Sequence, residues 1–382
     1  MGPLDDLRDR IRGMLWLGVY GDALGALHEA KGFDGEVGEP TSRLPKMPEE
    51  IEPRAWFIWA PANLVVGRRG VPTDDSMFRL FMLQRWLLED PVRTSYDEPA
   101  FREFLAGLEP GEEGSWQRHR HAQAVDWEKM FEAAEAEPPQ QVQFFEPGKP
   151  AVFGLFMLLE MAAFGVGRDP MEVYEEFYGA TQLDQGYGRA VTALLATWLA
   201  DALGRDGSPE EAGVDLVTRL LDVLDHRLAE TQDEVELAEL ADLVAVVERA
   251  IDLGVEFRGQ DESHFMEALA QRVYHGSDWP YGRNIDPFFF LLQITSVLSF
   301  ARDPLQALRA LAWGVGDSDT VASQLGSLLG ARLGYQYLLS LQDADVLLAD
   351  EFQTLHNVLY SIFDLDLDSR VDVFLRPADE SS

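Results

Sequence analysis

The chain has 382 residues, of which 46% are hydrophobic and 11% aromatic, so a packed core is expected and general disorder is excluded. It contains no cysteine, which excludes disulfides, thiolate zinc sites and a cysteine nucleophile. The formal net charge of −36, from 67 acids and 31 bases, disfavours binding to nucleic acid or to anionic membranes.

The acidic surface has two interpretations, adaptation to a high-salt environment or an ordinary solvated surface. The N-terminus, Met1 to Arg12, is charged and lacks the apolar segment of a signal peptide, so we expect a cytoplasmic protein. The two longest apolar stretches, 151–167 and 287–301, are interrupted by polar residues and are short for membrane spans. They predict buried helices.

Apolar residues recur with a helical period along most of the chain. The pattern predicts helices at 4–30, 77–88, 100–107, 116–135, 151–164, 170–179, 188–203, 210–228, 233–253, 262–274, 287–300, 304–313, 321–340 and 344–363. Strand-like alternation is scarce and is best at 54–66, while 31–53 and 135–150 are predicted to be long loops. We therefore expect an all-α fold in a single domain covering residues 1–382.

Two acidic clusters stand near opposite ends of the chain. The first acidic cluster is Thr73-Asp74-Asp75-Ser76, and the second acidic cluster is Asp317-Ser318-Asp319-Thr320. Each precedes an apolar run, so each is predicted to begin a helix. Brought together, the clusters would supply four carboxylates and hydroxyl oxygens, which are the ligands of Mg²⁺, Mn²⁺ or Ca²⁺ rather than of Zn²⁺ or copper.

The alternative interpretation of each cluster is helix capping. A Thr or Asp at a helix N-terminus satisfies free backbone N–H groups and interacts favourably with the helix dipole. Two clusters with two carboxylates each favour the metal interpretation, because the adjacent Asp74 and Asp75 repel each other unless a cation or solvent intervenes.

Glycines recur every fourth residue in two of the predicted helices, at Gly21 and Gly25 and again at Gly326, Gly330 and Gly334. Each costs about 1 kcal/mol relative to alanine within a helix, so close approach of two backbones is the expected compensation. If these two faces pack on each other or on a shared partner, Asp22 comes near the second acidic cluster.

Three motifs together carry a family resemblance. The run Gly21-Asp22-Ala23-Leu24-Gly25, with Glu29 four residues on, resembles the opening signature of the ADP-ribosylglycohydrolase family. The first acidic cluster, followed by Met77, resembles the family's central Thr-Asp-Asp-Thr motif. Gly316 and the second acidic cluster, followed by Ala322, Gly326 and Gly330, resemble its C-terminal Gly-Asp-Thr-Asp-Thr motif.

The resemblance implies a compact all-α domain of a dozen or more orthogonal helices around two divalent cations, Mg²⁺ or Mn²⁺. It places Thr73, Asp74 and Asp75 as metal ligands on one side of the centre. Asp317, Asp319 and Thr320 become ligands on the other side, with Asp319 as the candidate bridge between both ions.

The resemblance also implies substrate-side roles. Glu29 matches the acidic residue that the family keeps near the scissile bond and is the candidate catalytic group, while Asp22 is expected to orient the adjoining segment. Gly148 and Lys149 correspond to the loop that cradles the diphosphate, and Ser318 keeps the hydroxyl of the third motif. Pro150 has no backbone N–H to donate in that loop, and the Asn and Arg that the family usually carries there are absent.

The resemblance thus implies a metal-dependent hydrolase that cleaves ADP-ribose from a protein side chain or small acceptor. The alternatives are a degenerate, non-catalytic member that binds ADP-ribose, or a hydrolase of a different N-riboside. Neither alternative requires nucleic acid or membrane as a partner.

Overall fold

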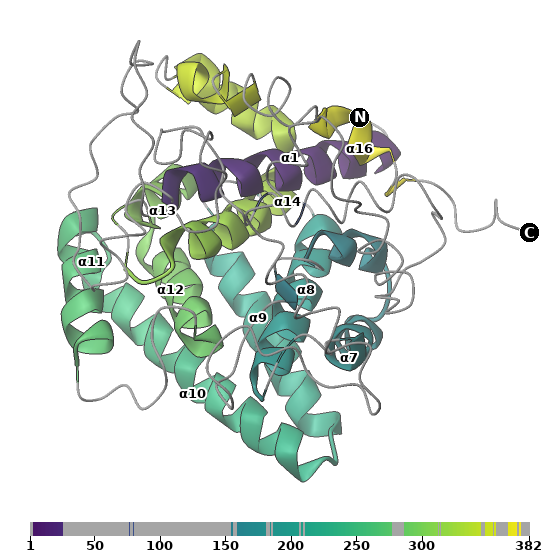
Figure 1. Ribbon diagram of the computed structural model, residues 1–382, viewed down its shortest axis with the longest axis vertical. Helices are drawn as coiled ribbons and strands as arrows, with labels where there is room; N and C mark the ends of the chain where they lie inside the picture. The colour runs from purple at the N-terminus through teal and green to yellow at the C-terminus, as the bar shows by residue number, and fades with distance from the viewer. Residues whose placement is uncertain are drawn as a thin grey trace, which may run out of the picture.

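The computed structural model describes a large part of the chain, and Figure 1 shows its arrangement. The described residues are 3–25, 76, 79, 154–155, 159–180, 184, 186–205, 208, 211–276, 286–311, 313, 315–344, 348–353, 355–356, 366–372 and 374–375. No strand occurs among them, so the all-α expectation is confirmed. The predicted strand at 54–66 and the predicted loops at 31–53 and 135–150 lie outside the described residues.

The described part of the chain forms a series of helices. They are α1 (Pro3–Gly25), the 3₁₀ helix η1 (Leu159–Gly165), α7 (Pro170–Ala180), α8 (Gly188–Leu203), α9 (Ala212–Glu230), α10 (Glu234–Phe257), α11 (Glu262–Leu269), the π-helix η2 (Ala270–Tyr274), α12 (Pro287–Phe300), α13 (Pro304–Leu311), α14 (Ser318–Ala344) and α16 (Leu367–Val371).

The centre of the core is formed by α8 and α12. Every residue of α12 is buried, including Gln293 and Thr295, and α8 is buried along almost its whole length. A helix that is apolar on all sides must be covered on all sides, as the sequence predicted for 287–301. In Figure 1, α10 packs along α12, while α14 lies between the centre of the core and α1.

Helix ends follow local chemistry. α12 begins at Pro287, and its N-cap Asp286 accepts hydrogen bonds from the N–H groups of Phe288 (3.0 Å) and Phe289 (3.4 Å). Asp233 caps α10 in the same way, accepting from Val235 at 2.8 Å.

Several predicted bounds need correction. α13 ends at Leu311, and the helix predicted at 262–274 changes from α to π geometry at Ala270. The helix predicted at 321–340 begins earlier, at Ser318, and is kinked at Gly334, whose φ is 78°. α16 was not predicted. Among the described helices, none has the length and apolarity needed to cross a membrane.

Candidate functional site

The glycines of α1 and α14 bring the two helices into direct backbone contact. A Cβ atom on Gly13 would lie 2.5 Å from the carbonyl oxygen of Gly330, and Gly21 faces the backbone of Ala322 in the same way. Because the contact moves forward along α14 as it moves back along α1, the helices are antiparallel. The predicted packing of the two glycine faces is therefore confirmed, and side chains at these positions would force the helices apart.

This packing places the last turn of α1 against the first turn of α14. The Ser318 hydroxyl donates a hydrogen bond to the carbonyl oxygen of Gly25 at 2.9 Å, and a Cβ atom on Gly25 would lie 2.5 Å from the amide nitrogen of Asp319. The sequence assigned Ser318 to the substrate side. In the structure, the Ser318 hydroxyl joins α1 to α14 at the predicted site.

Asp22 connects the same turn of α1 to the first acidic cluster. Its side chain is fully buried, and its Oδ2 accepts a hydrogen bond from the backbone N–H of Ser76 at 3.0 Å. Asp22 and Gly25 lie three residues apart and so are neighbours on the helix surface. One turn of α1 therefore holds Ser76 of the first acidic cluster and Ser318 of the second.

The second acidic cluster is buried at the N-terminus of α14. Asp317, Asp319 and Thr320 are 6%, 2% and 2% exposed, and Asp319 Oδ1 accepts a hydrogen bond from the Thr320 N–H at 2.9 Å. The preceding Gly316 has a φ of 70°, a left-handed conformation that favours glycine and turns the chain into the helix. Carboxylates here benefit from the positive end of the helix dipole.

The other half of the predicted site lies outside the described residues. Glu29, Thr73, Asp74, Asp75, Gly148 and Lys149 all fall there. Within the described ranges, no three Asp, Glu or His side chains gather closely enough to hold a metal ion. The assignment of metal ligands thus stays a prediction.

The described residues nevertheless suit a hard divalent cation. The functional groups that reach this end of α1 are carboxylate and hydroxyl oxygens, from Asp22, Ser76 and the second acidic cluster. The Ser76 hydroxyl is buried and has no hydrogen-bond partner among the described residues. Oxygen donors of this kind fit Mg²⁺ and Mn²⁺.

Two buried charged groups, Arg79 and Asp184, were not found from the sequence. Arg79, one turn after Ser76, forms an ion pair with Glu160 of η1. Asp184 is fully buried and accepts hydrogen bonds from the Gly154 N–H and the Thr192 hydroxyl, both at 2.7 Å. In the sequence, the feature that could have indicated the ion pair is Glu160, a charged residue inside the apolar stretch 151–167.

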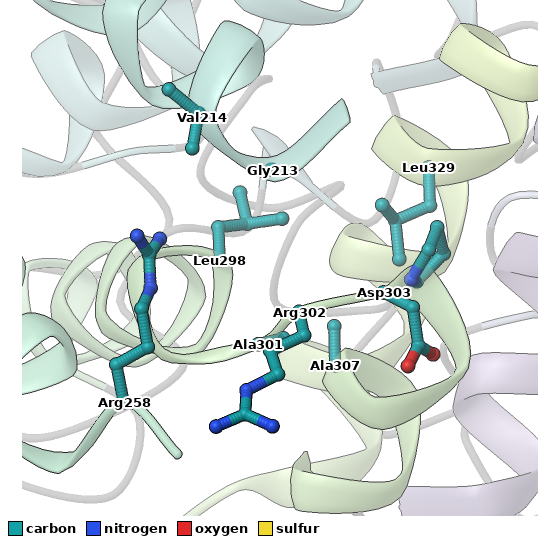
Figure 2. A pocket seen from close by; sticks show the side chains of 10 residues that line it. Gly213, Val214, Arg258, Leu298, Ala301, Arg302, Asp303, Ala307 and Leu329 are labelled. Atoms are coloured by element: carbon teal, nitrogen blue, oxygen red, sulfur yellow. The ribbon is translucent and has the colours of Figure 1, made fainter. Parts of the chain in front are cut away.

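A pocket of about 200 Å³ lies elsewhere, where the ends of α10 and α12 meet the starts of α9 and α13. Figure 2 shows Arg258 and Arg302 on one side of it and Asp303 on the other. α14 contributes Leu329, ten residues beyond Asp319, which is about 15 Å along a helix. This pocket is therefore separate from the second acidic cluster.

Comparisons with known proteins agree with the motifs. Residues 3–360 match the model of a family described as ADP-ribosylglycohydrolase. A solved structure described as "ADP-ribosylglycohydrolase-related protein complex" is similar with a TM-score of 0.49 and 17% identity, covering 92% of this chain and 99% of that chain. That likeness is too low to support a conclusion. No curated protein matches.

Proposed function

Because this chain belongs to the ADP-ribosylglycohydrolase family, we propose that it hydrolyses the glycosidic bond between ADP-ribose and an acceptor, which is a protein side chain or a small molecule. Membership of the family supports glycohydrolase activity in general. The dependence on two divalent cations and the identity of the acceptor are the finer parts of the proposal.

One observation carries the proposal: the same turn of α1 bonds to both acidic clusters. Asp22 accepts the Ser76 N–H, and Gly25 accepts the Ser318 hydroxyl. Asp74 and Asp75 directly precede Ser76, and Asp317 and Asp319 flank Ser318. The arrangement supports a shared site built from segments that are far apart in the sequence.

In this site, Thr73, Asp74 and Asp75 would hold cations from one side, and Asp317, Asp319 and Thr320 from the other. Two bound Mg²⁺ or Mn²⁺ ions would orient the ribose hydroxyls and lower the pKa of a water molecule. The first turn of α14 keeps its ligands oriented, since Asp319 is buried and bonded to the Thr320 N–H.

Glu29 would act on the substrate. Cleavage of the bond at ribose C1″ develops positive charge on the sugar, which a nearby carboxylate stabilises. The oxygen of water then bonds to C1″, and its proton passes to the departing nitrogen or oxygen of the acceptor, a transfer that Glu29 can mediate. Gly25 and its bond from Ser318 fix the end of α1 four residues before this carboxylate.

A second candidate, hydrolysis of a different N-riboside, is favoured by the altered diphosphate loop. Pro150 removes a donor beside Gly148 and Lys149. A degenerate member that binds ADP-ribose without cleaving it is the remaining alternative.

One assay separates these candidates. The protein is incubated with ADP-ribosyl-arginine, ADP-ribosyl-serine and plain nucleosides, with EDTA or with Mn²⁺, and free sugar is measured. We expect release of ADP-ribose with Mn²⁺ and none with EDTA. Release of ribose from nucleosides alone would favour the second candidate, and binding of ADP-ribose without release would favour the degenerate member.

Two variants test the roles of residues in this assay. Asp319→Asn should abolish activity and Mn²⁺ binding, whereas Glu29→Gln should keep Mn²⁺ binding and slow turnover about 10²–10⁴-fold. Asp252→Asn, which changes an exposed carboxylate of α10, is the matched control. Full activity of Glu29→Gln would show that Glu29 is not the catalytic carboxylate. Unchanged Mn²⁺ content of Asp319→Asn would show that Asp319 is not a metal ligand.

A further inference from the structure

Arg79 is buried between three parts of the protein near the predicted metal site. Arg79 is only 3% exposed. Its three guanidinium nitrogens donate hydrogen bonds to Glu160 of η1 and to the hydroxyls of Ser323 and Ser327 of α14. Space for the guanidinium is left by Gly18 of α1, where a Cβ atom would lie 2.6 Å from Nη2.

These bonds fix one helix relative to another. Ser76, the last residue of the first acidic cluster, and Arg79 are both helical and lie three residues apart, about one helical turn. Ser323 and Ser327 are four residues apart and share one face of α14, which begins in the second acidic cluster. Arg79 therefore links the segment that contains Ser76 to the helix that begins in the second acidic cluster.

The chemistry of the side chain favours positioning over simple packing. A buried charge loses its hydration, and an apolar side chain would fill the same space without that loss. The guanidinium is a rigid planar fork that bonds several partners at defined angles. Glu160, only 3% exposed, supplies the opposite charge.

We propose that Arg79 is a positioning residue of the predicted metal site. It sets the rotation and the separation of the segment containing Ser76 and Arg79 relative to the N-terminus of α14. The role in metal binding rests on the proposed function, whereas the fixing of the helix is independent of it.

The test compares Arg79→Lys with Arg332→Lys. Arg332 is also a buried arginine of α14, 7% exposed, and it bonds Asp215 and the Arg205 carbonyl, both at 2.7 Å. It lies thirteen residues beyond Asp319, about 20 Å along α14. Both variants keep the positive charge and lose the fork, so similar losses in melting temperature are expected.

The two variants should differ in metal binding measured by calorimetry with Mn²⁺. Arg79→Lys should weaken Mn²⁺ binding at least tenfold, while Arg332→Lys should leave it unchanged. Gly18→Ala, whose methyl group would meet both the Ser327 hydroxyl and the Arg79 guanidinium, should weaken Mn²⁺ binding in the same direction. Unchanged Mn²⁺ affinity in a folded Arg79→Lys protein would overturn the positioning role.

Amide hydrogen exchange separates this inference from the proposed function. The peptide containing Ser76 should exchange faster in Arg79→Lys and Arg79→Met than in wild type, with Arg332→Lys as the control. If wild type binds no Mn²⁺, the metal part of the proposed function fails, and exchange alone decides whether Arg79 holds this helix. Equal exchange in all variants would overturn the inference.

Discussion

Ser318 and Gly25 are joined by a hydrogen bond of 2.9 Å although 293 residues separate them in the chain. The bond closes the contact between the end of α1 and the start of α14. It lies beside Asp317 and Asp319, so the same contact that stabilises the helix pair also orients the second acidic cluster.

Removing this hydroxyl should affect both stability and the predicted reaction. Ser318→Ala is expected to lower the free energy of unfolding by about 1 kcal/mol, because one intramolecular hydrogen bond is lost. Turnover should fall as well, since Glu29 follows the end of α1. Ser340→Ala removes a bond of the same type, from an exposed hydroxyl to the Tyr337 carbonyl, and should leave turnover unchanged. Urea unfolding and single-turnover kinetics measure the two effects.

Removing the carboxylate of Asp22 should destabilise the protein. Asp22→Ala removes the acceptor of the Ser76 N–H and is expected to cost about 1.5–3 kcal/mol, the range for hydrogen bonds to charged groups. Asp22→Asn keeps one acceptor oxygen and should cost less. Mn²⁺ affinity is expected to fall with Asp22→Ala, whereas Asp233→Ala, which removes only the cap of α10, should not change it. Equal Mn²⁺ binding by both alanine variants would contradict a role for Asp22 at the site.

The glycine contacts of α1 and α14 should not tolerate a methyl group. Gly13→Ala is expected to destabilise the protein by about 1–3 kcal/mol or more, because its Cβ atom would meet the Gly330 backbone, which cannot move aside. Gly204→Ala is the control, since its Cβ atom would meet no atom closer than 3.6 Å. A comparison of melting temperatures measures the difference. Equal melting temperatures for the two variants would mean that α1 can shift away from α14.

Two carboxyl groups of α10 should change stability with pH in opposite directions. Burial alone would raise the pKa of Glu236, but hydrogen bonds from Arg227 and Thr231 outweigh burial and lower the pKa below its usual 4.5. Burial raises the pKa of Glu239 above 4.5, against the opposing effects of Arg189 and Tyr178.

Glutamine variants at these two positions test the signs. Because its folded pKa is lowered, Glu236 stabilises the protein above pH 4.5 and loses this effect as the pH falls through the folded pKa. Glu236→Gln should therefore cost about 1.5–3 kcal/mol at pH 7 and little in strong acid. Glu239 favours folding when protonated, and this effect is lost as the pH rises, so Glu239→Gln should stabilise at pH 7.

Urea unfolding at several pH values measures both differences, with Glu248→Gln at an exposed position of α10 as the control. Loss of stability at neutral pH in Glu239→Gln would show that its bond from the Tyr178 hydroxyl, at 3.4 Å, outweighs burial.

Patterns local to the sequence predicted the helices well. The bounds predicted for α8 and α12 are those observed, because each is a nearly continuous apolar run that starts at a glycine or a proline. The repeated spacing of Gly21 and Gly25 and of Gly326 and Gly330 also identified a close helix contact, since few other arrangements compensate the cost of glycine in a helix.

Features that depend on distant partners were not predictable in the same way. The ion pair of Arg79 and Glu160 joins residues 81 positions apart, and an isolated charge in an apolar run does not identify its partner. Gly334 belongs to the glycine face, since its backbone lies against Gly13, but the spacing did not predict its positive φ and the kink in α14. The change to π geometry at Ala270 likewise has no signal in the hydrophobic period.

The antiparallel pairing of α1 with α14 has a consequence for biosynthesis. α1 leaves the ribosome almost three hundred residues before its partner, and at about 5–20 residues per second it waits roughly 15–60 s. During that time the surface of α1 that carries Gly13, Gly21 and Gly25 lacks the backbone it meets in the finished protein. We therefore expect the nascent chain to depend on a chaperone that shields this surface until translation of α14 is complete.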